Sequence, residues 1–176
     1  MRAARLTEIS DFLERSRADV YGAIAGVPEA RIEQAPADGG WSIAQVLEHL
    51  ALAEAKTSQY LRARLDKAVA AGLASETDDT PVMGTFDPHV LTSGPLAAPE
   101  GVVPGAAVSA AAAIANLRAS HAEMHATLQA ADGWALAQVS TGHPILGRLN
   151  MYQALIAVGY HDRRHTGQIA RVLATH

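Results

Sequence analysis

Apolar residues recur every three or four positions in four long stretches of the chain, separated by polar or glycine- and proline-rich segments. This spacing is typical of amphipathic helices that bury one face. The first stretch starts at Thr7 or Ser10, either of which can cap a helix, and ends near residue 25. The other three cover about 42–72, 106–130 and 150–174. Because no segment reads as a credible strand, the pattern predicts four helices and no sheet.

Four helices of roughly 20 to 30 residues predict an all-α fold, a four-helix bundle formed by residues 1–176 as one domain. The second and third helices are joined by a long connection, Ser75 to Gly105, which contains five prolines. A connection of this length in a compact domain is commonly a lid or the wall of a site. We therefore expect it to fold over one end of the bundle and to line the mouth of a pocket.

Composition narrows the class of protein. Hydrophobic residues make up 49% of the chain and charged residues 18%, as in a globular protein, and the net charge of −4 comes without any basic block. Nucleic acid is therefore an unexpected partner, because phosphate binding needs clustered Lys and Arg. No apolar run reaches the length of a membrane span or a signal peptide, so we expect a soluble cytoplasmic protein. Without cysteine, the chain has no disulfide and no cysteine nucleophile.

Two histidines of the last predicted helix mark the first candidate site. His161 and His165 are four residues apart and therefore leave the same helix face, one turn apart. That face carries the apolar residues of the helix, so the imidazoles are expected to be buried and need polar partners. A metal ion would satisfy both rings, as histidines at i and i+4 commonly bind one ion. Hydrogen bonds to neighbouring core residues are the alternative.

A second pair with the same spacing, His121 and His125, lies on the third predicted helix, and spacing alone does not decide between the pairs. His49 lies on the largely apolar face of the second helix, where a single histidine is more often a hydrogen-bonded core residue. Together with His161 and His165, it would supply three nitrogen ligands and leave one coordination position open. Three protein ligands and an open position are typical of catalytic zinc sites.

Three segments resemble the DinB-like superfamily of four-helix-bundle metalloproteins. They are the sequence WSIAQVLEHLALAE from Trp41 to Glu54, HPILG from His143 to Gly147, and YHDRRHTGQI from Tyr160 to Ile169. The resemblance implies a variant of the up-and-down bundle with a long loop between the second and third helices. It also implies that His49, His161 and His165 bind a divalent metal, zinc or nickel.

The resemblance further implies an activity class, because characterised relatives use low-molecular-weight thiols in S-transfer or isomerisation. A thiol at the open position would be deprotonated by the metal, and a chain without cysteine would need such a co-substrate. We therefore expect a metal-dependent thiol S-transferase or isomerase that acts on a small-molecule substrate. The alternatives are a metal-dependent hydrolase and a non-enzymatic, metal-stabilised module. The module would pair as a homodimer or bind a partner through Tyr21, Tyr60 and Tyr152.

Supporting roles are expected for several polar residues near the three histidines. Gln45 and Gln168 each lie one helical turn from a predicted ligand and could orient its imidazole ring. Arg164 could attract an anionic substrate, and His121, alone or with His125, is the predicted acid–base group. His89, in the long connection, is expected to be solvated.

Overall fold

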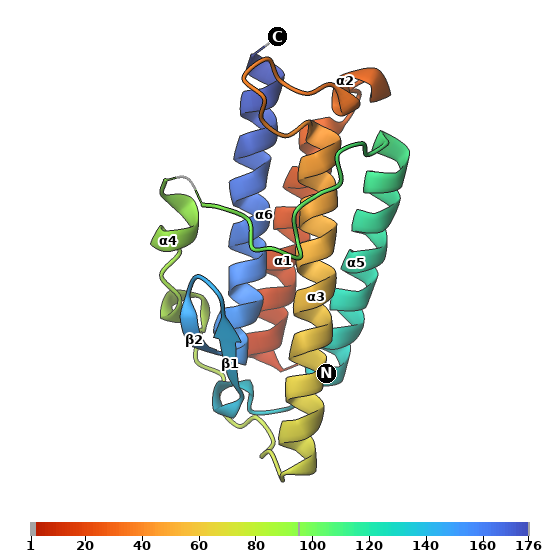
Figure 1. Cartoon of the computed structure of the whole chain (residues 1–176). Helices are drawn as coiled ribbons and strands as arrows, with labels where there is room; N and C mark the ends of the chain where they lie inside the picture. The colour runs from red at the N-terminus through yellow and green to blue at the C-terminus, as the bar shows by residue number, and fades with distance from the viewer. Residues whose placement is uncertain (1–2, 95, 176) are drawn as a thin grey trace.

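The computed structural model describes residues 3–94 and 96–175, so Met1, Arg2, Pro95 and His176 of the predicted domain lie outside it. Four long helices dominate the described chain (Figure 1). They are α1 (Ala4–Ile24), α3 (Ile43–Ala70), α5 (Ala110–Ala131) and α6 (Met151–Ala174). The prediction of an all-α four-helix bundle is confirmed.

Shorter elements lie between the long helices. They are α2 (Glu29–Glu33), η1 (Met83–Thr85), α4 (His89–Thr92), η2 (Leu136–Gln138), β1 (Ser140–His143) and β2 (Gly147–Asn150). The two strands pair antiparallel, with Ser140 opposite Asn150. The prediction of no strands was therefore wrong. Each strand has only four residues, too few to show alternation, and the hairpin depends on its turn rather than on a hydrophobic pattern.

The helices alternate in direction in an unusual order. In Figure 1, α1 and α6 run upward, whereas α3 and α5 both run downward. Because α3 and α5 are parallel, the chain must return along the full length of the bundle between them. Residues 71–109 make this return and cross the side of the bundle in front of α3 and α6. We call this segment the crossover; it covers a side of the bundle and not the end that we had predicted.

Several hydrogen bonds fasten the crossover to the helices. Near its start, Glu76 accepts a hydrogen bond from the hydroxyl of Tyr152 at 2.6 Å and pairs with Arg5. In its middle, Arg164 of α6 donates to the carbonyl oxygens of Leu91 and Gly94, both at 2.9 Å. These contacts hold the crossover against α6 along much of its length.

Local sequence explains where the helices begin. Ser42 caps α3 in a capping box with Gln45, and Asn150 caps α6 in the same way. The predicted caps of the first helix are wrong, because α1 begins before both of them and Ala3 occupies the cap position. Thr7 and Ser10 lie inside the helix, where the hydroxyl of Thr7 donates back to the carbonyl of Ala3.

Two apolar clusters form the core, and a layer of polar side chains lies between them. The lower cluster in Figure 1 contains Leu6, Phe12, Leu61 and Leu155, and the upper one contains Val20, Leu47, Leu117 and Ile169. We call the residues between them the polar layer: Arg17, Tyr21, Glu54, Ser120, His121 and Asp162. Each of the four long helices supplies at least one of these residues, so the layer spans the bundle.

Gly159 allows α1 and α6 to pack closely, because a Cβ atom at this position would overlap the ring of Phe12. We expect Gly159→Ala to lower the free energy of unfolding by about 1–3 kcal/mol, the usual cost of overpacking a core. Gly22→Ala is the matched control, since nothing lies near its Cβ position in α1. Denaturant unfolding of both variants tests this, and equal effects would contradict the close packing.

Candidate metal centre

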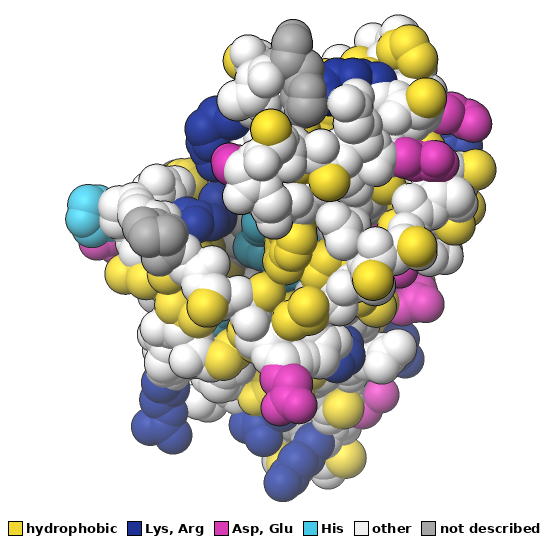
Figure 2. All heavy atoms as spheres, turned by 45° about the horizontal axis from the view of Figure 1, so that its top comes forward, with side chains coloured by type: hydrophobic (Ala, Val, Ile, Leu, Met, Phe, Trp, Pro, Cys, Tyr) yellow, Lys and Arg dark blue, Asp and Glu magenta, His cyan; other side chains and the backbone are white. Residues whose placement is uncertain are grey.

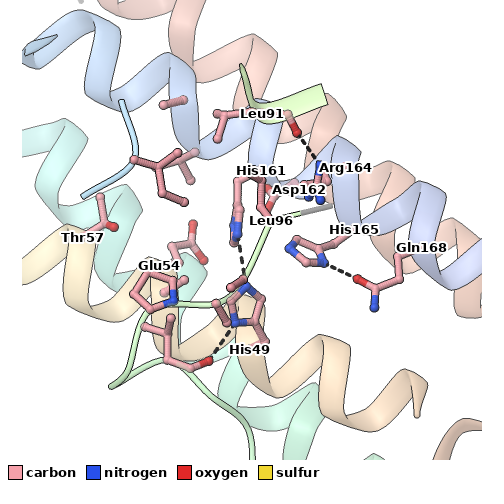
Figure 3. Close-up of a pocket in the computed structure, with 18 of the residues that line it drawn as sticks. His49, Glu54, Thr57, Leu91, Leu96, His161, Asp162, Arg164, His165 and Gln168 are labelled. Atoms are coloured by element: carbon pink, nitrogen blue, oxygen red, sulfur yellow. Dashed lines mark hydrogen bonds between the residues drawn. The ribbon is translucent and has the colours of Figure 1, made fainter. Parts of the chain in front are cut away.

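Three imidazole rings from two helices meet on one side of the bundle. His49 comes from α3, and His161 and His165 come from α6 (Figure 3). The Nε2 atoms of His49 and His161 are 3.2 Å apart, and one nitrogen from each of the three rings lies within 4.8 Å of the others. Among the described residues, no other group of three histidines or carboxylates is placed to hold a metal. The structure thus brings the three predicted ligands together.

Hydrogen bonds fix the orientation of two of these rings. Nδ1 of His49 lies 2.7 Å from the carbonyl oxygen of Val102, and Nδ1 of His165 lies 2.7 Å from Oε1 of Gln168. Since both partners only accept, each Nδ1 must carry the proton and donate. The Nε2 atoms of these rings therefore keep a free lone pair directed at the cluster, as a metal ligand requires.

The surroundings keep the three rings neutral. Burial lowers the pKa of His49, and it lowers the pKa of His161 well below the ordinary value. Burial also lowers the pKa of His165 to about 3, with a further contribution from the charge that His49 would carry. At neutral pH, all three rings are thus uncharged, so metal binding does not first require an imidazolium to lose its charge.

The donor set fits a divalent metal. Two ligands at about 2.0–2.1 Å from a tetrahedral zinc ion are roughly 3.3 Å apart, close to the separation of the His49 and His161 nitrogens. The cluster supplies three neutral imidazoles and no fourth histidine or carboxylate from the described chain. Such a set leaves one position for another ligand, as in catalytic rather than structural sites.

The cluster lies in the wall of a groove with a volume of about 1080 Å³. Residues of α3, α6, the crossover and the hairpin of β1 and β2 line it, and histidine side chains are visible within it in Figure 2. Leu96, Pro99 and Val102 show that the crossover forms one of its walls. The expectation that the long connection lines the pocket is confirmed, although it does so from the side of the bundle.

The polar layer lies directly behind the groove. The guanidinium of Arg17 forms an ion pair with the carboxylate of Glu54, which also accepts a hydrogen bond from Ser120 at 2.8 Å. Glu54 and Asp162 also line the groove, and burial raises the pKa of both carboxyl groups. Oδ2 of Asp162 is buried without a hydrogen-bond partner in the described chain.

His121 belongs to this layer and is absent from the described residues that line the groove. Its Nδ1 lies 3.1 Å from the hydroxyl of Tyr21, and its Nε2 lies 3.3 Å from Oε2 of Glu54. Burial and the charge of Arg17 lower its pKa to about 3. Any acid–base role of His121 would therefore have to pass through Glu54. His125 and His89 are both exposed, the latter as expected.

The other predicted residues divide clearly. Gln168 contacts a candidate ligand, as predicted. Gln45 does not, because its side chain completes the capping box of α3 and donates to the carbonyl of Gly105 at 2.9 Å. Arg164 lines the groove, but its nitrogens donate to carbonyls of the crossover. Arg164 therefore holds the crossover in place, and its predicted attraction of an anionic substrate stays a prediction.

Comparison with known proteins decides the family. A family model described as the DinB superfamily matches residues 13–169, most of the chain. The chain belongs to the DinB superfamily. The match includes all three segments that carried the resemblance.

A solved structure supports the fold of this DinB-superfamily chain. The crystal structure of TT2238, a four-helix bundle protein, has a TM-score of 0.63 to this chain at 20% sequence identity. The alignment covers 94% of this chain and 98% of that one. No curated protein matches the chain. In the described residues, no helix is both long and apolar enough to cross a bilayer.

Two contributors to the site are not apparent from the sequence. The carbonyl of Val102 orients His49, and a backbone oxygen leaves no mark in the sequence. His143 lines the groove from β1, although we had noted it only as part of a family motif. His143 precedes Pro144 in a segment that we predicted as a connection, and this position does not indicate that the residue lies near His161.

Gln168 should matter for metal affinity and not for folding. We expect Gln168→Leu to weaken metal binding about 10- to 100-fold, because Nδ1 of His165 loses the acceptor that fixes its ring. Competition with a chelator of known affinity measures the effect. Gln129→Leu, at an exposed position of α5, is the matched control and should leave the affinity unchanged. Equal losses in both variants would show that the Gln168 contact is not specific.

Proposed function

We propose that this DinB-superfamily protein is a divalent-metal-dependent enzyme of the thiol S-transferase or isomerase type, with His49, His161 and His165 as the metal ligands. The observation that carries the proposal is the three-histidine cluster in the wall of a large groove. A structural site would be closed by a fourth protein ligand. An open position facing a groove instead suits the binding and activation of a small molecule.

When bound, a zinc or nickel ion would supply Lewis acidity that lowers the pKa of a coordinated thiol at neutral pH. The chain's own residues do the rest. The three neutral imidazoles hold the ion, while Val102 and Gln168 keep two of the rings in place. Because the chain has no cysteine, the thiol must come from a low-molecular-weight co-substrate.

Metal-dependent hydrolysis is the second candidate, and Glu54 is the observation that favours it. Its carboxyl group reaches the groove, and burial raises its pKa toward the range useful for proton transfer. In this version, Glu54 would accept a proton from the attacking water, and His121 would support it from behind at 3.3 Å. The non-enzymatic dimer is less well supported, because Tyr152, one of its predicted contact residues, is only 2% exposed.

Metal analysis and an activity screen together test the proposal. Protein purified without a histidine tag should contain about one equivalent of zinc or nickel. Loaded protein should conjugate a small thiol to 1-chloro-2,4-dinitrobenzene, and chelation should abolish the reaction. Turnover of p-nitrophenyl acetate with no thiol-dependent reaction would favour the hydrolase. Protein that binds no metal would overturn both versions.

A further inference from the structure

The groove extends to both sides of the histidines along α6, and its two ends differ in chemistry. Beside the C-terminal half of α6, the lining includes the polar side chains of Asp38, Gln168, Arg171 and Thr175, together with Trp41 and Val172. Beside the N-terminal half it is mainly apolar, with Leu61, Leu91, Leu96, Ile145, Ala157 and Val158. We call these the polar end and the apolar end. The histidine cluster lies between them, within reach of molecules bound at either side.

The apolar end has walls that are fixed in place. Its crossover wall is held to α6 by the hydrogen bonds from Arg164 to the carbonyls of Leu91 and Gly94. Its hairpin wall is held to α3, because the hydroxyl of Tyr60 accepts from the backbone N–H of Gly142 at 2.9 Å. Arg64 also donates to the carbonyl of Ser140. A preformed apolar cavity of this kind is typical of a small-molecule site.

Two large exposed apolar side chains lie at the same mouth. Among the described residues, the large exposed hydrophobic side chains are Tyr60, Val90, Val103 and Ile145. Of these four, Tyr60 and Ile145 line the groove. Figure 2 shows apolar side chains around the opening where the histidines are visible. Apolar surface concentrated at one opening points to an apolar ligand.

His143 is one of several polar residues at this mainly apolar end, beside Thr57, Tyr60 and Thr141. Its Nδ1 accepts hydrogen bonds from the backbone N–H groups of Ile145 and Leu146, at 3.2 and 3.1 Å. The neutral ring must therefore carry its proton on Nε2, on the side away from the turn. No acceptor in the described chain is found for that N–H. That N–H is thus available as a donor to a bound molecule.

We propose that the apolar end binds the electrophilic substrate, a molecule with an apolar or aromatic skeleton and a carbonyl oxygen that accepts the Nε2–H of His143. The assignment as electrophile rests on the proposed function, whereas the binding of an apolar carbonyl compound does not. The polar end suits the thiol co-substrate, because low-molecular-weight thiols are polar. Each end of the groove thus selects one reactant, and the histidine cluster lies between the two.

Equilibrium dialysis with two probes tests the binding. We expect 2-acetylnaphthalene to bind about three- to tenfold more tightly than 2-ethylnaphthalene, the effect of one hydrogen bond. His143→Asn should remove this preference, because an Asn side chain can still accept from the turn but does not extend into the groove. Ala157→Phe, which fills the apolar end, should weaken both probes at least about tenfold. Ala115→Phe, on the exposed face of α5, is its control.

Leu96→Asn gives a second test if Ala157→Phe fails to fold, since Leu96 is only partly buried on the crossover. It should also weaken both probes. Unchanged binding in Ala157→Phe and Leu96→Asn, or weaker binding in Thr175→Phe at the polar end, would overturn the inference. Protein that holds metal but neither probe would refute the inference and leave the proposed function standing. Protein that binds the probes but no metal would refute the proposed function and leave the inference about the apolar end standing.

Discussion

Replacing His165 with alanine is expected to remove the metal from the purified protein, and His161→Ala should do the same. Each substitution deletes one of three nitrogens that must act together, and the two remaining imidazoles do not make a stoichiometric site. His121→Ala should keep the full metal content, because that residue lies behind Glu54 and outside the cluster. Elemental analysis of the three purified variants beside the unaltered protein measures the difference.

The same variants test which of the two histidine pairs binds the metal, the one on α5 or the one on α6. His125 is exposed and His121 faces the polar layer, so the α5 pair does not converge on a common point with a third ligand. His125→Ala completes the comparison and should also retain metal. Loss of metal from His121→Ala together with its retention by His165→Ala would reverse the assignment.

Replacing Arg17 with methionine should have the largest effect on stability. Arg17 is the cation of the polar layer and pairs with Glu54, whose carboxyl group is buried beside that of Asp162. Breaking a buried ion pair by removing one partner typically costs about 3–5 kcal/mol. We expect a loss of that size at pH 7, measured by denaturant unfolding. Arg62→Met, which breaks an exposed pair with Asp66, should cost less than about 1 kcal/mol.

The loss in Arg17→Met should shrink in acid. Burial raises the pKa of Glu54 and Asp162, and Arg17 opposes that rise in both. Without Arg17, both carboxyl groups are protonated in the folded state at pH values where the unfolded chain is ionised. The folded state then binds more protons, so its stability increases as the pH falls toward the ordinary carboxyl pKa near 4. A gap between variant and native protein that stays constant from pH 7 to 5 would contradict this account.

Helical periodicity predicts most of the fold and two of the three candidate ligands. It indicated the four long helices, and the i, i+4 spacing placed His161 and His165 on one face of α6. The capping boxes at Ser42 and Asn150 each need only a partner three residues further on, so the starts of α3 and α6 can be predicted from the local sequence. The choice of His49 as the third ligand came from the family resemblance, because spacing within one helix says nothing about a neighbouring helix.

Features that depend on contacts between distant segments of the chain could not be predicted from the sequence. Gln45 and Gln168 each lie about one helical turn from a histidine, yet only Gln168 contacts one, because Gln45 is hydrogen-bonded to the crossover. Arg17 and Asp162 are ordinary charged residues in the sequence, and only the packing of α1 and α6 against α3 buries them. The hairpin is likewise held to α3 by Tyr60 and Arg64, which lie far from it in the sequence.

The hydrogen bond between His49 and Val102 ties the candidate metal centre to the crossover. Opening the crossover would release the ring of His49, and any ligand that holds this ring must stabilise the closed crossover by the same free energy. Protease sensitivity between residues 96 and 105 should therefore report on occupancy of the histidine cluster. The crossover makes the site accessible to control from the surface, because a partner that engages residues near Val102 would alter metal affinity without touching a ligand.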